Sequence, residues 1–342
     1  MKQVFIAQFH DSTELTARMK EGMNWIDAPS IIPRDAHVFI KPNLTWVEPT
    51  PGVTTTPQML EALVAYLTPQ TSKLVIGESN GGQNCFIADE AFERHGVYDI
   101  ATKYGAKVVN LSNEKREFAS TTVGAKEIVV ELPSILLHDI DIFITLPVPK
   151  VHAMTQVSLG FKNQWGCQPD IMRFRNHPHF ADVIIAINKL LNSRIAVFDG
   201  TYFLNRTGPM VGEPVKMDSL IISNDIGAGS LACCEIMQIN PKKVKHFRIA
   251  QQEGMFPRSS HEIRFNRPPS QFSTRKFHLD YTMLNWAQLS AFKFRWANRF
   301  FHDSKYADPL HEFIFWIRRN PMICRLLYGQ FGPGEARRRS SY

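Results

Sequence analysis

Basic side chains, imidazoles and amides are concentrated between Pro149 and His179, and these groups can bind anions and transfer protons. The segment holds Lys150, His152, Lys162, Asn163, Arg173, Arg175, His177 and His179. If Ile171–His179 is extended, its two-residue period places both arginines and the last two histidines on one face. Guanidinium groups pair with carboxylates or phosphates, and histidine transfers protons near neutral pH. The segment therefore predicts a site for a small anion; a solvated basic loop is the alternative.

Lys162 is a candidate for covalent or proton-transfer chemistry. Phe161 and Trp165 flank it in the sequence, and apolar surroundings lower the pKa of a lysine because they disfavour its charged form. Such a lysine acts as a nucleophile or as an acid–base group. The alternative is a surface lysine whose methylene stem lies on apolar side chains. For Cys167, which could be a reactive thiol beside these cations, we favour a packing role.

Apolar runs alternate with helical patterns through the first 257 residues. We expect strands over Val38–Ile40, Lys73–Ile76, Ala106–Asn110, Ile140–Thr145, Arg194–Phe198 and Ser219–Ser223. We expect helices over Pro57–Leu67, Ala88–Tyr104 and Phe180–Leu191, and a further helix after Asp225. Such alternation is typical of an α/β fold with a mainly parallel sheet flanked by helices.

Polar clusters follow four of these strands, and ligands of open α/β sheets bind beyond the carboxyl ends of the strands. In chain order the clusters hold Lys41 with Asn43, Glu78, Lys150 to His152, and Asp199. We expect Lys41 and Asn43 to close a pocket formed by the segment Pro149–His179. The acidic residues Glu78, Asp199 and Asp225 are further candidates for the site.

Composition limits the class of protein. The chain has 342 residues, of which 44% are hydrophobic, enough for one large domain or two medium ones. Its five cysteines are scattered without a CxxC pair, so we expect reduced thiols and no iron–sulfur cluster of the chain's own. The first residues lack the pattern of a signal peptide, and no apolar run is long enough to span a bilayer. These features predict a cytoplasmic protein, peripheral to a membrane at most.

The positive charge lies at the end of the chain. Residues 258–342 contain 15 basic and 6 acidic residues, a net charge of +9, whereas residues 1–257 contain 24 and 26, a net charge of −2. The end is also rich in aromatic residues at helical spacing. We therefore expect two regions: an α/β body over residues 1–257 and a basic, aromatic-rich helical arm over residues 258–342. The arm suits packing on the body or on a partner, or contact with an anionic membrane surface; no motif indicates specific nucleic-acid binding.

Short motifs in a fixed order resemble the family known as domain of unknown function 362. They are Ile40–Leu44, Thr54-Thr55 with Pro57, Ile76–Glu78, Pro149–His152, Lys162-Asn163 with Gly166 and Pro169, His179, Asp199-Gly200, Gly208-Pro209 with Gly212, and Ser223–Asp225. The resemblance covers roughly residues 38–254. Many members carry ferredoxin-like cysteine motifs, which this chain lacks. Members also carry an acidic residue where this chain has Ser230.

The central segment also resembles the core motif of the lactate racemase family, in which a histidine precedes a lysine by ten residues and a second histidine follows. Here His152, Lys162 and His179 match these positions, with Ser158 and Gly160 between the first two. The resemblance implies that His152 moves protons, that Lys162 carries a nickel-pincer nucleotide and that His179 ligates nickel. The doubled glycine and the Pro-Gly of that motif are absent from this chain.

Together these observations favour an enzyme that acts on a small anionic or polyhydroxylated metabolite. Arg173, Arg175, His177, Lys150 and Asn163 would bind the substrate, while His152, Lys162 and His179 would do acid–base work. The reaction is isomerase-, lyase- or oxidoreductase-like. One alternative is an accessory protein that binds a cofactor or a redox or biosynthetic partner without catalysis. Another is a binding protein recruited to a membrane surface by its basic arm.

Overall fold

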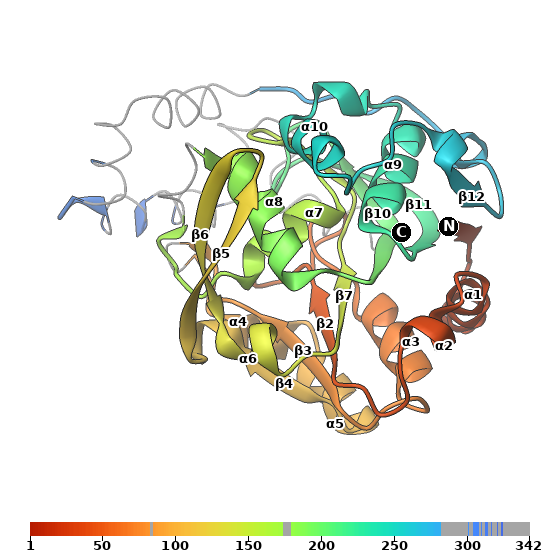
Figure 1. Ribbon diagram of the computed structural model, residues 1–342, viewed down its shortest axis with the longest axis horizontal. Coiled ribbons are helices and arrows are strands. Elements are labelled where there is room, and N and C mark those ends of the chain that lie inside the picture. The colour runs from red at the N-terminus through yellow and green to blue at the C-terminus, as the bar shows by residue number, and fades with distance from the viewer. Residues whose placement is uncertain are drawn as a thin grey trace.

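A ten-stranded mixed sheet forms the centre of the molecule (Figure 1), with the strand order β12-β1-β11-β10-β7-β2-β3-β4 and the hairpin β8–β9 attached to β10. The computed structural model describes residues 1–82, 85–173, 179–281, 300, 304–307, 309, 312–313, 316, 320 and 323. The strands of the sheet are β1 (Lys2–Gln8), β2 (Val38–Pro42), β3 (Leu74–Glu78), β4 (Lys107–Asn110), β7 (Ile142–Leu146), β8 (Lys150–His152), β9 (Gln156–Ser158), β10 (Ile195–Asn205), β11 (Glu213–Ser223) and β12 (Ile263–Phe265).

Five neighbouring strands, β10, β7, β2, β3 and β4, pair in parallel. The strands β1 and β11 pair antiparallel, as do β10 and β11. A mainly parallel sheet with helices between its strands is an α/β fold, so the expected fold class is confirmed. The parallel strands all end at the same edge of the sheet, which is where the polar clusters of the sequence lie.

Helices cover both faces of this sheet (Figure 1). Val38 and Ile40 on β2 pack into one core with α1 (Ser12–Trp25), α3 (Pro57–Leu67), α4 (Ala88–Arg94) and α5 (Val97–Tyr104). Phe39, on the opposite face of the same strand, packs into a second core with α8 (Phe180–Leu191), α9 (Ile226–Ile236) and α10 (Lys245–Gln252). Because successive side chains of a strand point to opposite faces, a continuous apolar run supplies both cores.

Shorter elements complete the described part. The helices α2 (Ala28–Ile31) and α6 (Ser134–His138) lie in connections, and α7 (Gly160–Asn163) follows the β8–β9 hairpin. A separate antiparallel hairpin, β5 (Arg116–Val123) with β6 (Lys126–Pro133), belongs to the core that contains α8. Neither hairpin was expected from the sequence. No helix among the described residues is both long enough and apolar enough to span a membrane.

The predicted helices over Pro57–Leu67 and Phe180–Leu191 are confirmed with these bounds. Thr56 caps the first of them by accepting a hydrogen bond from the Met59 amide, and Pro57 takes the first helical position. The single helix expected over Ala88–Tyr104 is wrong. Gly96 has a φ of 65°, a left-handed conformation that ends α4 and allows the chain to restart as α5.

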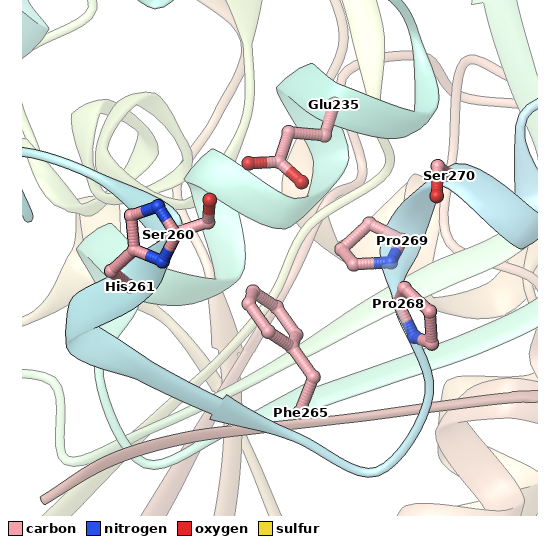
Figure 2. Close-up of a pocket in the computed structure, with 7 residues that line it drawn as sticks. All are labelled: Glu235, Ser260, His261, Phe265, Pro268, Pro269 and Ser270. Atoms are coloured by element: carbon pink, nitrogen blue, oxygen red, sulfur yellow. The ribbon is translucent and has the colours of Figure 1, made fainter.

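Residues after Pro257 contribute to the body. The strand β12 pairs in parallel with β1, and the Phe277 amide donates a hydrogen bond to the Met237 carbonyl. Figure 2 shows a pocket between the end of α9 and this returning chain, lined by Glu235, Ser260, His261, Phe265, Pro268, Pro269 and Ser270. The body therefore reaches beyond the boundary expected at residue 257. Most of the aromatic and basic arm expected after it lies outside the described residues.

Candidate functional site

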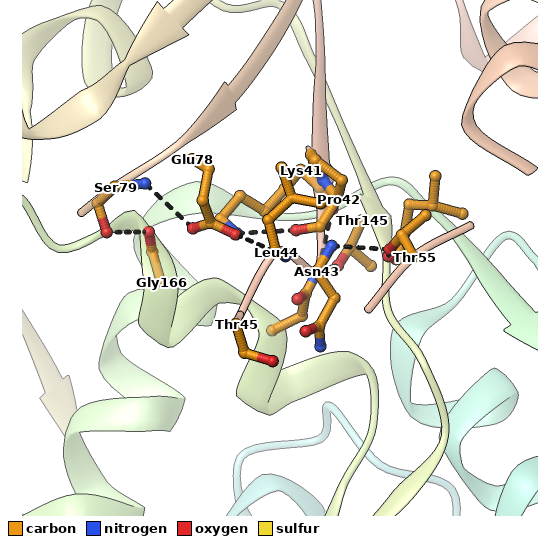
Figure 3. A network of polar contacts seen from close by, with 12 residues as sticks. Lys41, Pro42, Asn43, Leu44, Thr45, Thr55, Glu78, Ser79, Thr145 and Gly166 are labelled. Carbon is orange, nitrogen blue, oxygen red and sulfur yellow. Dashed lines mark hydrogen bonds and ion pairs between the residues drawn. The ribbon is translucent and has the colours of Figure 1, made fainter. Parts of the chain in front are cut away.

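The site lies where β2, β3 and β7 end and where the β8–β9 hairpin leads into α7. Lys41, near the end of β2, forms an ion pair with Glu78, the last residue of β3, with 2.6 Å between Nζ and Oε2. Both side chains are buried, at 1% and 4% exposure. The Glu78 carboxylate also accepts hydrogen bonds from the amides of Leu44 and Ser79 (Figure 3). Burial of this pair is tolerated because the carboxylate has several donors around it.

The backbone at Gly166 approaches this ion pair closely. A Cβ atom added at Gly166 would lie 2.7 Å from Glu78 Oε1 and 3.1 Å from Lys41 Nζ, so a side chain at this position displaces the pair. The Gly166 carbonyl accepts a hydrogen bond of 2.6 Å from the Ser79 hydroxyl (Figure 3). Asn163 donates from its amide to the Lys41 carbonyl and to the Thr145 hydroxyl, both at 2.9 Å. The segment that follows α7 is thereby fixed against the ends of three parallel strands.

Lys150, on β8, is a second buried lysine of the site. It is 1% exposed, and its ammonium donates to Asn43 Oδ1 at 3.1 Å and to the Val53 carbonyl. Burial lowers its pKa well below the usual value, and the positive charges of Lys162 and Lys41 lower it further, while Glu78 acts in the opposite direction. Asn43 therefore positions Lys150, and its expected role in closing a pocket stays a prediction.

Arg173 is buried at 6% exposure and connects two loops of the site. Its guanidinium donates to the Ser79 hydroxyl and the Asn80 carbonyl on one side and to the Gln168 carbonyl on the other, at 2.8 to 3.1 Å. Burial lowers its pKa, and the Glu78 charge opposes this effect. Protein oxygens thus satisfy much of its hydrogen-bonding capacity.

Lys162 differs from the other basic residues of the site because solvent reaches part of its side chain. Its Nζ lies 5.4 Å from the centre of the Phe180 ring, a favourable cation–π arrangement. Its pKa is lowered from 10.5 to about 7, first by desolvation and then by the positive charges of Arg173 and Lys41. The predicted desolvation of Lys162 is therefore present, although Phe180, not Phe161, provides the aromatic contact.

Lys41, Lys150, Lys162 and Arg173 are referred to below as the basic cluster. Lys41 pairs with Glu78, Lys150 donates a hydrogen bond to Asn43, and Arg173 donates one to Ser79. The charges of Arg173 and Lys41 lower the pKa of Lys162, and the charge of Lys162 lowers the pKa of Lys150. Among the described residues, Glu78 is the one buried carboxylate that pairs with the cluster. The site therefore holds more positive than negative charge in an environment that screens charge poorly.

The predicted histidines His152 and His179 lie in different surroundings. His152 ends β8 at 6% exposure, and its Nδ1 accepts a hydrogen bond from the Met154 amide at 3.1 Å. His179 occupies the position before α8 and is exposed. The expected extended segment is not seen where the chain is described, since Ile171 and Met172 form a turn and Arg173 is buried while His179 is exposed. Arg175 and His177 lie outside the described residues.

Metal binding by these residues stays a prediction. Among the described residues, no three or more His, Cys, Asp or Glu side chains are grouped as metal ligands. The nickel-pincer nucleotide implied by the second resemblance likewise stays a prediction.

Two acidic candidates stabilise helix starts. The Asp199 carboxylate accepts hydrogen bonds from the amide and hydroxyl of Thr56, the cap of α3, and from the amide and hydroxyl of Thr201. Burial raises its pKa. Asp225 caps α9 by accepting from the Ala228 amide and pairs with Lys2 at 3.4 Å. Asp225 is therefore a helix-capping residue, whereas Asp199 holds the capping residue Thr56 in place. A role of either carboxylate in the site stays a prediction.

Gln164 and His246 are polar residues near the site that sequence reasoning missed. Gln164 has 0% exposure, and neither its side-chain oxygen nor its nitrogen has a hydrogen-bond partner within the described structure. His246 on α10 is buried with an unpartnered Nε2, and its pKa is lowered to about 3 by burial and by the Lys162 charge. A polar residue directly after Lys162-Asn163 was a usable signal for Gln164. His246 is 84 positions from Lys162 in the sequence, so no local signal could have found it.

Cys167 is buried among the charged groups of the site. Its exposure is 0%, and burial raises the pKa of its thiol to about 12. A thiol with so high a pKa is not ionised at neutral pH and is a poor nucleophile. The packing role favoured from the sequence agrees with this environment. The described cysteines Cys85, Cys167, Cys233 and Cys234 are all buried.

The sequence matches the model of a protein family described as "Domain of unknown function (DUF362)" over residues 38–235. This range covers more than half of the chain and contains the candidate site residues named above apart from His246. The chain belongs to the DUF362 family. The resemblance identified from the motifs is thus confirmed, and the basic cluster lies wholly within the family region.

A curated relative and two solved structures are similar to this DUF362 member. A protein of Synechocystis sp. described as thylakoid-associated is 23% identical over 228 residues, which cover 64% of this chain and 68% of that protein. The lactate racemase apoprotein from Thermoanaerobacterium thermosaccharolyticum has a TM-score of 0.43 and 13% identity over 69% of this chain and 57% of its own. A Thermotoga maritima protein has a TM-score of 0.35 and 10% identity over 56% and 51% of the two chains. Neither structural similarity bears on the activity of this chain.

Proposed function

We propose that this protein is an enzyme that acts on a small anionic metabolite, with Lys162 as its acid–base group. The observation that carries the proposal is the excess of basic groups in the basic cluster: among the described residues, four basic side chains accompany one buried carboxylate, that of Glu78, and Lys41 and Arg173 alone exceed its charge. Buried charges without counter-charges are costly, and a carboxylate or phosphate of a ligand would offset that cost. The cluster also lies beyond the carboxyl ends of parallel strands, where α/β proteins bind ligands.

The acid–base role of Lys162 follows from its environment. With a pKa of about 7, its amine is present in both protonation states near neutral pH. A group that titrates near the working pH is suited to accept a proton from a substrate and to return it. Lys41 and Arg173 supply the positive charge that holds the anion, and Asn163 fixes the segment next to Lys162. The reaction that we propose is isomerase-, lyase- or oxidoreductase-like.

Ligand-induced stabilisation tests this proposal. The thermal unfolding of the protein is measured with phosphate, with acetate and with the uncharged compound glycerol at constant ionic strength. We expect the anions to raise the Tm, because a ligand that binds the folded state stabilises it. Lys162→Met should reduce this response, while Lys20→Met, a change at an exposed lysine of α1, should preserve it. An equal response of all three proteins, or none to either anion, contradicts the proposal.

A metabolite-turnover screen addresses catalysis. A Lys162→Ala variant that folds and keeps full activity would remove this lysine from the mechanism. Proton transfer by His152 or His179, and substrate binding by Arg175 and His177, stay predictions. The accessory-protein and membrane-surface alternatives also stay predictions; a thylakoid-associated relative is in keeping with the second.

A further inference from the structure

The four members of the basic cluster differ in how far a small molecule can reach them. Lys41 and Lys150 are each 1% exposed, and their ammonium groups are held by protein oxygens. Arg173 is 6% exposed and is held by oxygens of two loops. Lys162 is half-buried and lies against the face of an aromatic ring. Lys162 is therefore the least buried member of the basic cluster.

The positive charges of Arg173 and Lys41, which are buried and held by their partners, act on that amine. A nearby cation disfavours the protonated form of an amine and increases the fraction that has a free electron pair. The same cations attract an anionic group of an incoming molecule. An amine in such surroundings is equipped to attack a carbonyl group, a known way of activating a lysine nucleophile.

We propose that Lys162 forms a protonated imine with a small carbonyl compound that also carries a carboxylate, a 2-oxo acid. This inference rests on the anion-binding part of the proposed function, because the cluster that holds the anion also holds the carboxylate of the 2-oxo acid. The Lys162 amine then acts as a nucleophile, in place of the acid–base role that it has when it stays unbonded. Lys41 and Arg173 act here through their charges, since their hydrogen-bonding groups are already occupied by Glu78 and by loop oxygens.

The chemical step balances without a further reactant. The electron pair of Lys162 Nζ attacks the carbonyl carbon, a nitrogen–carbon bond forms, and the carbonyl π-electrons move to oxygen. A proton passes from nitrogen to that oxygen to give a carbinolamine. The carbon–oxygen bond then breaks with addition of a second proton, water leaves, and a carbon–nitrogen double bond with a positive nitrogen remains. This positive nitrogen accepts the electron pair released when an adjacent C–H or C–C bond breaks, as isomerase- or lyase-like chemistry requires.

Borohydride trapping tests the inference on the full chain. The protein is incubated near pH 7 with pyruvate, borohydride is added to reduce the imine to a secondary amine, and intact mass and peptide mapping locate the adduct. We expect one adduct with the mass of pyruvic acid less one oxygen atom, on the peptide that contains Lys162. Its yield should exceed that at any other lysine by about tenfold or more, because amines with ordinary pKa values are almost fully protonated at this pH.

Control compounds distinguish how much the carboxylate and the carbonyl group of pyruvate each contribute to formation of the adduct. Acetone, a carbonyl compound without a carboxylate, should give less adduct, and added acetate should compete with pyruvate. Lys162→Arg keeps a positive charge and should abolish the adduct, while Lys20→Met should leave it unchanged.

Adducts spread evenly over lysines of the unaltered protein would overturn the inference, and this readout does not depend on any variant folding. If acetate or phosphate raises the Tm but pyruvate gives no adduct at Lys162, the imine fails while the proposed function stands; if no anion binds, both fail.

Discussion

The charge state of Lys162 should appear as a pH dependence of stability that is lost in Lys162→Met. Its pKa in the folded protein is about 7, compared with an ordinary value of 10.5. At about 1.4 kcal/mol per pKa unit, this difference corresponds to at most about 5 kcal/mol of destabilisation when the lysine is charged in both states. Solvent reaches part of the side chain, so the measured value should be smaller than this upper limit.

The direction of the effect follows from proton binding. Below pH 7 the lysine is protonated in the folded and the unfolded protein, and the full destabilisation applies. Between pH 7 and 10.5 the unfolded state binds more protons, so the free energy of unfolding rises with pH. Above that range the amine is neutral in both states, and the contribution disappears.

Urea denaturation measures this contribution. The free energy of unfolding is determined between about pH 7.5 and 9.5 for the unaltered protein and for Lys162→Met, so that other titrating groups largely cancel. We expect the unaltered protein to gain up to about 1.4 kcal/mol per pH unit relative to the variant. The Lys20→Met control should give a curve parallel to that of the unaltered protein. Parallel curves for Lys162→Met as well would refute a lowered pKa and, with it, the acid–base role.

Two further predictions concern the neighbours of Lys162. Glu78→Gln leaves the buried ammonium of Lys41 without its counter-charge, and urea denaturation should show a loss of about 3–5 kcal/mol, whereas a loss below about 1 kcal/mol would contradict a buried ion pair. Gly166→Ala places a methyl group 2.7 Å from Glu78 Oε1 and should cost about 1–3 kcal/mol by displacing the pair. Anion binding by that variant should weaken in the thermal-unfolding measurement, and unchanged stability and binding would show that Gly166 is not in contact with the pair.

Much of the fold was readable from the sequence because local patterns coincided with the final structure. Thr56-Pro57 marks the start of α3, and the parallel strands appear as short apolar runs, since both their faces are buried. The prediction of secondary structure was wrong where one local pattern is compatible with two structures. The helical pattern of Ala88–Tyr104 continues through Gly96, but packing selects two helices with a left-handed residue between them.

Only some of the site residues could be predicted from the sequence. Placement after strand ends identified Lys41, Glu78 and Lys150 because parallel strands bring their carboxyl ends to one edge. The same reasoning selected Asp199, which accepts a hydrogen bond from the amide of Thr56, and Asp225, which caps α9; their role in the site stays a prediction. Residue type and position in the sequence cannot distinguish a carboxylate that binds a ligand from one that accepts hydrogen bonds from backbone amides of its own chain.

The sequence by itself determined the α/β class, the family and the set of basic residues near Lys162, because these depend on local periodicity and on motif order. Only the tertiary structure decided how these residues divide their roles. It buries Lys41 against Glu78, fills the hydrogen-bonding groups of Arg173 with loop oxygens, and leaves Lys162 partly exposed beside Phe180. The pKa of Lys162 depends on burial and on charges distant in sequence, and both exist only once the chain has folded.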